Sequence, residues 1–322
     1  MGKSLKNILI VGGLGYLGGR MAKYFSDNGY SVLITTRRDE RNFPKNVPLN
    51  NSVMQVDYKS DEQLNEAMKG ISTLIHLAGP DAHTISKNRD SIILEHLELT
   101  GRLIHAAEVN DIKKFIYFST IHVYGKNLKG TITEATRPIP VHPFAKAHFE
   151  AESIIESQTK KVISVIVRCS NSFGAPYFEN EKCWKLVVND LCRSAFQNGR
   201  LIINSSGQAY CDFIAVEDVV RAVHHLIELN NERVTHNIYN LGSSHTVRII
   251  DMAKNIQKEL KDDFDYECPI ETNKTSTESN KVDSFIFSIK KIMQTGFRLD
   301  YSDKEISLLL DYCKMKYQLV VN

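Results

Sequence analysis

The stretch VGGLGYLGG, residues 11–19, restricts the possible folds of this chain more than any other feature. It follows a short apolar run at residues 7–11 and opens a segment whose apolar residues recur with helical spacing. Those residues are Leu17, Met21, Tyr24 and Phe25. The pattern predicts a strand, a tight turn and a helix, which is the start of a βαβ unit.

Three glycines at three-residue intervals lie in this turn. A phosphate-binding turn needs a glycine to turn tightly, another to let a pyrophosphate approach the helix N-terminus, and another to let the helix pack close to the sheet. Gly12, Gly15 and Gly18 meet this need, with Tyr16 and Leu17 between them. A plain glycine-rich turn is the alternative, but the complete βαβ context favours dinucleotide binding.

The first half of the chain alternates β-branched runs with helical periodicity, which is typical of a parallel sheet with crossover helices. Strands are expected at 7–11, 31–36, 53–56, 73–77, 114–119 and 162–168. We predict an α/β fold with a Rossmann-type doubly wound parallel sheet in residues 1–174. Residues 175–322 should form mainly a smaller C-terminal α/β substrate lobe, with residues 210–245 returning in part to the sheet.

Composition excludes several classes of function. The formal net charge is only +2, so nothing global favours a nucleic-acid partner. The six cysteines are irregularly spaced and contain no CxxC pair, which fits neither a metal site nor a disulfide framework and indicates a cytoplasmic location. The first apolar run is too short for a signal peptide or a membrane span, so no membrane partner is expected.

The end of the second expected strand points to the coenzyme. An acidic residue there would accept hydrogen bonds from the ribose diol of NAD. The chain instead has Thr36, Arg37 and Arg38, and guanidinium groups can bind a 2′-phosphate. NADP(H) is therefore preferred, with NAD(H) as the alternative; the two arginines could also belong to a solvated charged loop.

Further segments carry a family likeness: VDYKSDEQL, LIHLAG, FIYFSTIHVYG, KAHFEAE, VRCSNSFGAP, CDFIAVEDV and YNLGSS. With these, the chain resembles the extended short-chain dehydrogenases/reductases, which include nucleotide-sugar epimerases, dehydratases and 4-ketoreductases. The resemblance implies that Asp57 and Tyr58 lie near the adenine. It also implies that Leu77, Ala78 and Gly79 line the dinucleotide.

The resemblance also implies a set of catalytic residues. The family uses a Tyr in a YxxxK motif, assisted by a Ser or Thr, and Thr120 matches that hydroxyl. Lys146 matches the lysine, which in the family also holds the nicotinamide ribose, because Glu150 follows four residues later. The tyrosine position then falls on His142. His142 as the proton donor would favour mildly acidic conditions, since the ordinary pKa of histidine is near 6.5. Alternatively His142 only caps the helix before Pro143, and His122 or a water supplies the proton.

On the substrate side, the resemblance places Asn171 near the phosphates of a nucleotide sugar, with a turn asparagine before Gly174 as the alternative. It also places His122 where dehydratases carry an acidic residue, so His122 is expected to face the substrate. At the position where relatives carry an arginine that binds the diphosphate, this chain has Cys211. Other cations must then bind the diphosphate, and the nearest in the lobe are Arg200, Arg193 and Lys185.

The expected function is an NADPH-dependent reductase of a nucleotide-linked keto sugar, such as a 4-keto-6-deoxyhexose. A 4-epimerase with bound NAD and an inactive dinucleotide-binding protein are the alternatives. Relatives dimerise through two helices, so a homodimer through residues 90–109 and 143–158 is expected.

Overall fold

The computed structural model describes residues 7–80, 89–179, 181–230, 238–273 and 283–317. Its centre is a seven-stranded sheet in the order β11-β7-β5-β4-β1-β2-β3, with every neighbouring pair parallel. The strands are β1 (Asn7–Val11), β2 (Ser31–Thr36), β3 (Asn51–Gln55), β4 (Thr73–His76), β5 (Lys114–Thr120), β7 (Ile163–Cys169) and β11 (Ile238–Leu241). This order confirms the predicted Rossmann-type fold.

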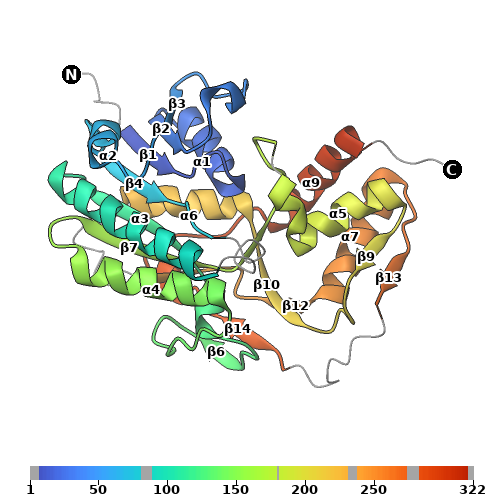
Figure 1. Ribbon diagram of the computed structural model, residues 1–322. Coiled ribbons are helices and arrows are strands. Elements are labelled where there is room, and N and C mark those ends of the chain that lie inside the picture. Colours follow the sequence, from blue (N-terminus) through green and yellow to red (C-terminus); the bar gives the residue numbers. More distant parts are fainter. Residues whose placement is uncertain (1–6, 81–88, 180, 231–237, 274–282, 318–322) are drawn as a thin grey trace.

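Helices cover both faces of the sheet (Figure 1). One face carries α1 (Tyr16–Asp27) and α6 (Val216–Glu228), which pack against each other. The other carries α2 (Asp61–Met68), α3 (Arg89–Val109) and α4 (Pro143–Gln158), with α3 packed between its two neighbours. Because both faces are covered, the central strands are continuous apolar runs, and all seven residues of β5 are buried.

A smaller lobe is built on the carboxyl end of the sheet (Figure 1). It contains α5 (Val187–Asn198), α7 (Ile249–Phe264) and α9 (Ser302–Tyr317), with β9 (Leu201–Ile203) paired to β13 (Ile270–Thr272). A three-stranded sheet joins β8 (Asn171–Phe173), β10 (Tyr210–Ala215) and β12 (Thr246–Arg248). Remaining pieces are β6 (Gly130–Ile132), β14 (Phe285–Phe287), α8 (Lys290–Gln294), η1 (Glu40–Asn42), η3 (Ile121–Tyr124) and η4 (Glu181–Lys185). None of the described helices is long and apolar enough to cross a membrane.

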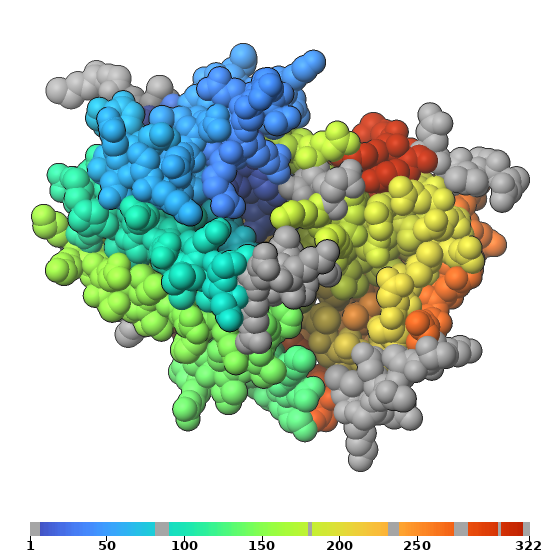
Figure 2. Space-filling model, viewed as in Figure 1, coloured from blue at the N-terminus to red at the C-terminus, as the bar shows by residue number. Residues whose placement is uncertain are grey.

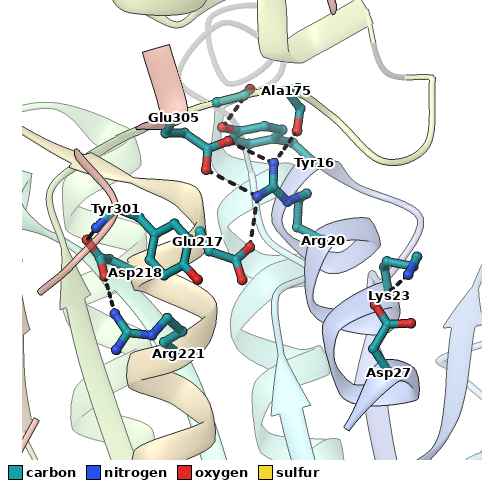
Figure 3. A network of polar contacts seen from close by, with 11 residues as sticks. Tyr16, Arg20, Lys23, Asp27, Ala175, Glu217, Asp218, Arg221, Tyr301 and Glu305 are labelled. Atoms are coloured by element: carbon teal, nitrogen blue, oxygen red, sulfur yellow. Dashed lines mark hydrogen bonds and ion pairs between the residues drawn. The ribbon is translucent and has the colours of Figure 1, made fainter. Parts of the chain in front are cut away.

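One arginine on α1 connects the sheet to this lobe (Figure 3). Arg20 donates from Nη1 to the Ala175 carbonyl at 3.0 Å and to Glu305 Oε1 on α9 at 2.8 Å. It also donates from Nη2 to Glu217 Oε2 on α6 at 2.8 Å. The Glu305 side chain is fully buried, so its charge depends on this partner.

We therefore expect Arg20→Ala to lower the free energy of unfolding by about 3–5 kcal/mol, because it leaves the carboxylate of Glu305 buried without its partner. The control is Lys23→Ala on the same helix, where Lys23 pairs with Asp27 on the surface. Loss of that exposed pair should cost at most about 1 kcal/mol. Urea unfolding measures both; equal losses in the two variants would contradict the role assigned to Arg20.

Candidate active site

The glycine turn has the geometry of an anion site. Gly12 has a φ of +81°, and a Cβ added there would lie 2.8 Å from the backbone nitrogen of Ala78. A Cβ on Gly18 would lie 2.4 Å from the Cα of Gly13, so a side chain would push α1 away from the turn. Gly15 is the N-cap of α1, and no side chain caps its first turn. The turn can therefore present backbone amides to a phosphate.

This turn forms one wall of a cleft of about 690 Å³ at the carboxyl edge of the sheet. That volume lies within the range of about 300–1,000 Å³ typical of small-molecule sites. In Figure 2 the surface is hollowed where the blue and green N-terminal half meets the yellow residues. Most residues predicted to hold the dinucleotide line this cleft: Gly12, Gly15, Tyr16, Leu17, Gly18, Thr36, Arg37, Arg38, Tyr58, Leu77, Ala78 and Gly79. Thr120, predicted to act in catalysis, lines it as well.

The end of the cleft near β2 is cationic. Arg38 is exposed, and its backbone N–H donates to Thr36 Oγ1 at 3.2 Å. Arg37 is 74% exposed and lies 3.8 Å from Glu95, measured from Nη1 to Oε2. Asp57 lines a small adjoining pocket together with Arg37 and Tyr58. This end can therefore hold an anionic group, although Glu95 neutralises part of the positive charge of Arg37.

Thr120 lies at the other end of the cleft, where β5 stops. Its Oγ1 accepts the backbone N–H of His122 at 3.3 Å and so starts the η3 turn. His122 faces a second pocket of about 530 Å³, which Asn171 and Cys211 also line. Asn171 donates from Nδ2 to the carbonyl of Asp212 at 2.9 Å. Burial, followed by the charge of Asp212, raises the pKa of Cys211 to about 11, which keeps the thiol protonated.

Three predicted site residues line none of these three pockets. His142 is exposed and serves as the N-cap of α4, because its Nδ1 accepts the Phe144 N–H at 3.2 Å. Lys146 is exposed on the same helix and is absent from the linings of both pockets. Arg200 donates to Glu271 at 2.8 Å on the surface of the lobe, also away from both linings. The capping role considered for His142 is thus what the structure shows.

Instead, α4 presents Phe144 and His148 to the cleft, one helical turn apart. Their orientation is set by Glu152, a further turn along and 1% exposed. Its carboxylate binds Arg168 through Nε and Nη2, at 3.1 and 2.6 Å. Burial alone would lower the pKa of Arg168, but the hydrogen bonds and charge of Glu152 raise it.

Phe144 and His148 were not identified from the sequence because the lysine position was chosen by a glutamate four residues later, and two glutamates fit that spacing. Glu150 stands four residues after Lys146, and Glu152 stands four residues after His148. Glu150 is exposed, whereas Glu152 is in the buried ion pair. The signal that could have separated them was Arg168, a charged residue inside an otherwise apolar strand pattern, which needs a buried acidic partner.

Behind His148 lies a buried cluster of imidazoles. His148 Nδ1 is 2.7 Å from the Tyr117 hydroxyl, which is 2.9 Å from Nε2 of His96. His76 Nε2 contacts the Thr100 hydroxyl at 3.1 Å. Burial lowers the pKa of His96 to about 4 and lowers the pKa of His76 and of His148 well below 6.5, with mutual repulsion adding to the last two. All three rings are therefore neutral at pH 7.

The protein should lose stability below pH 6.5 for this reason. In the unfolded chain these histidines bind protons near pH 6.5, whereas in the folded chain they remain neutral until the pH reaches their lowered pKa. Each then contributes a slope of roughly 1.4 kcal/mol per pH unit between those values, with unfolding favoured by acid. Urea unfolding from pH 7 to pH 5 measures the slope. His96→Asn should reduce it by that amount, and an unchanged slope would contradict this account.

Comparison with known proteins supports the sequence-based resemblance. The family model described as NAD dependent epimerase/dehydratase family matches residues 8–242. The dTDP-D-glucose 4,6-dehydratase of Homo sapiens is 30% identical over 186 residues, covering 57% of this chain and 48% of that protein. The enzyme of the same name from Dictyostelium discoideum is 24% identical over 277 residues, covering 78% of this chain and 62% of that protein. The chain therefore spans less than two thirds of these relatives.

Solved structures agree in fold. The UDP-glucose 4-epimerase from Brucella ovis in complex with NAD superposes with a TM-score of 0.82 at 18% identity, covering 96% of this chain and 98% of that one. The UDP-glucose 4-epimerase with UDP-glucose from Thermotoga maritima gives 0.77 at 20% identity, covering 96% and 99%. The predicted membership of the epimerase/dehydratase family, whose model is described as NAD dependent, is confirmed. The preference for NADP(H) stays a prediction, since the Brucella protein holds NAD.

Proposed function

We propose that this chain, which belongs to the NAD dependent epimerase/dehydratase family, is an NADP(H)-dependent reductase of a nucleotide-linked keto sugar, such as a 4-keto-6-deoxyhexose. The observation that carries the proposal is the layout of the cleft. One cavity runs from Arg37 and Arg38, past the glycine turn, to Thr120. Directly beyond Thr120, His122 and Asn171 line a second pocket that can take the sugar end of a substrate.

The residues present fit a dinucleotide. The amides of the glycine turn would hold the pyrophosphate, Tyr58 would lie beside the adenine, and Thr120 would hydrogen-bond the reacting oxygen. A bound reduced coenzyme would supply hydride to a carbonyl in the second pocket. The loop residues Lys126 and Lys129 line that pocket and offer cations near Cys211, although Lys129 pairs with Asp283.

Two other functions remain candidates. A 4-epimerase would retain NAD and consume none, as suggested by the NAD-containing epimerase neighbour. A coenzyme-binding protein without turnover is favoured by Phe144, because an aromatic hydrocarbon at the reacting end of the cleft has no proton to give. Absorbance of the freshly purified protein tests the first, and oxidation of NADPH with a panel of nucleotide-linked 4-keto sugars tests the second. Coenzyme binding without turnover on the whole panel would contradict the reductase.

The coenzyme preference can be measured by calorimetry. We expect the Arg37→Ala, Arg38→Ala double variant to bind NADP(H) about 10²- to 10⁴-fold more weakly, because each of the two arginines loses a charge-assisted hydrogen bond that contributes about 1.5–3 kcal/mol. Its affinity for NAD(H) should change little, since NAD lacks the 2′-phosphate. Lys146→Ala is the matched control: it removes an exposed cation outside the cleft and should leave both affinities unchanged. Tighter binding of NAD(H) than of NADP(H) by the unaltered protein would overturn the preference.

We also propose a cytoplasmic homodimer that associates through α3 and α4. These helices lie side by side on one outer face of the molecule (Figure 1). Leu94 on α3 is 56% exposed, which leaves an apolar side chain available for such a contact. Analytical ultracentrifugation tests the assembly, and a monomer at micromolar concentration would contradict it.

A further inference from the structure

Phe144 stands between two histidines that belong to different pockets. Its ring packs edge to face against His148, with centroids 4.6 Å apart, and against His122, with centroids 6.2 Å apart. His148 lines the coenzyme cleft, and His122 lines the second pocket. Phe144 therefore stands between a histidine of one pocket and a histidine of the other, and His122 follows Thr120 by two residues.

The two histidines differ in how they can exchange protons. His148 is 8% exposed, and its Nδ1 is bound to the Tyr117 hydroxyl, behind which lies His96. Tyr117 has one proton, so it can donate to only one of these rings and must accept from the other. His148 can thus hydrogen-bond a hydroxyl as a neutral ring, and burial lowers its pKa so far that it carries no extra proton near pH 7. His122 is exposed, so water can reprotonate it.

Other groups near Thr120 are unsuited to donate a proton. Ser119 donates its hydroxyl to the Glu152 carboxylate. Cys169 lines the cleft, but burial, followed by the charge of Asp212, raises the pKa of its thiol to about 12. Phe144 has no polar atom. Among the described groups at this junction, His122 is the imidazole that both lies beside Thr120 and reaches solvent.

We propose that His122 is the general acid of the reduction, while His148 stays neutral and positions the coenzyme. This rests on the proposed reductase function. When bound, the reduced coenzyme supplies the hydride and is oxidised. The carbonyl carbon gains a C–H bond, and its oxygen takes the π electrons of the broken C=O bond. That oxygen bonds to the proton of the His122 imidazolium, whose N–H bond breaks, and water returns a proton to the neutral ring.

The charge state of His122 depends on the groups that face it. Two imidazoles lie near the ring: that of His142 on α4 and, on the other side of Phe144, that of His148. The second pocket adds further titratable groups, which are Lys126, Lys129, Tyr210, Cys211 and Asp283. Desolvation of the ring by the surrounding protein lowers the pKa of His122, and the charge of His142 lowers it further. The imidazolium therefore forms as the pH falls below 6.5, so kcat/KM should rise toward acid.

A variant of His142 tests whether the general acid is His122 or the neighbouring His142. Asn is also a good N-cap, so His142→Asn keeps the start of α4 while removing the repulsive charge. The pKa of His122 should then rise, which an NMR titration of the imidazole measures in the coenzyme-free protein. The pH at which kcat/KM falls from its plateau at low pH should move higher, and the plateau itself should stay unchanged. A loss of the plateau rate would make His142 the acid and overturn the proposal.

His122→Ala tests the same role directly. We expect kcat to fall about 10²- to 10⁴-fold, the usual contribution of a general acid, while the Kd for NADPH stays the same. Added imidazole should restore part of kcat, because the exposed site leaves room for it. Wild-type-like turnover by His122→Ala would sink the role of His122 and leave the reductase standing. Absence of turnover by the unaltered protein would sink both, and unchanged coenzyme affinity would show that the variants are folded.

Discussion

The ion pair between Glu152 and Arg168 is the interaction on which the geometry of the site depends. Both side chains are almost fully buried, so each charge needs the other. Ser119 donates to the same carboxylate, and Arg168 reaches the Tyr124 hydroxyl at 3.0 Å. That hydroxyl donates to Asn240 on β11 at 2.6 Å. One charged pair thereby ties α4, η3 and three neighbouring strands at the edge of the sheet where the cleft opens.

This pair also determines which residues of α4 can act. A helix repeats every 3.6 residues, so burying Glu152 against the sheet turns His148 and Phe144 toward the same side. His142 and Lys146 stand two positions away from those residues, about 200° around the helix axis, and remain in solvent. The buried Glu152–Arg168 pair thus determines that Phe144 and His148, and not His142 and Lys146, line the cleft.

The fold was predictable because its signals are local. The ends of β1 and β2 agree with the predicted strands, since each is a buried apolar run closed by glycine or by a charged pair. Gly12 and Gly18 were identified from their spacing because backbone geometry alone requires them. The reacting end of the cleft was less predictable. Its residues are fixed by a partner on another strand, and the spacing of a glutamate after a candidate residue fits both Lys146 and His148.

The two ends of the cleft have opposite electrostatic character, and this separates binding from chemistry. Arg37 and Arg38 are exposed cations, and because a guanidinium is only weakly hydrated they can bind an anion at a small desolvation cost. Around Phe144 the walls are apolar or neutral, because burial keeps His148 uncharged. An oxyanion formed there would meet the Thr120 hydroxyl, and Lys182 also lines the cleft. In the proposed reductase, a proton from His122 would neutralise the charge as it develops, so the protonation state of His122 would govern the rate.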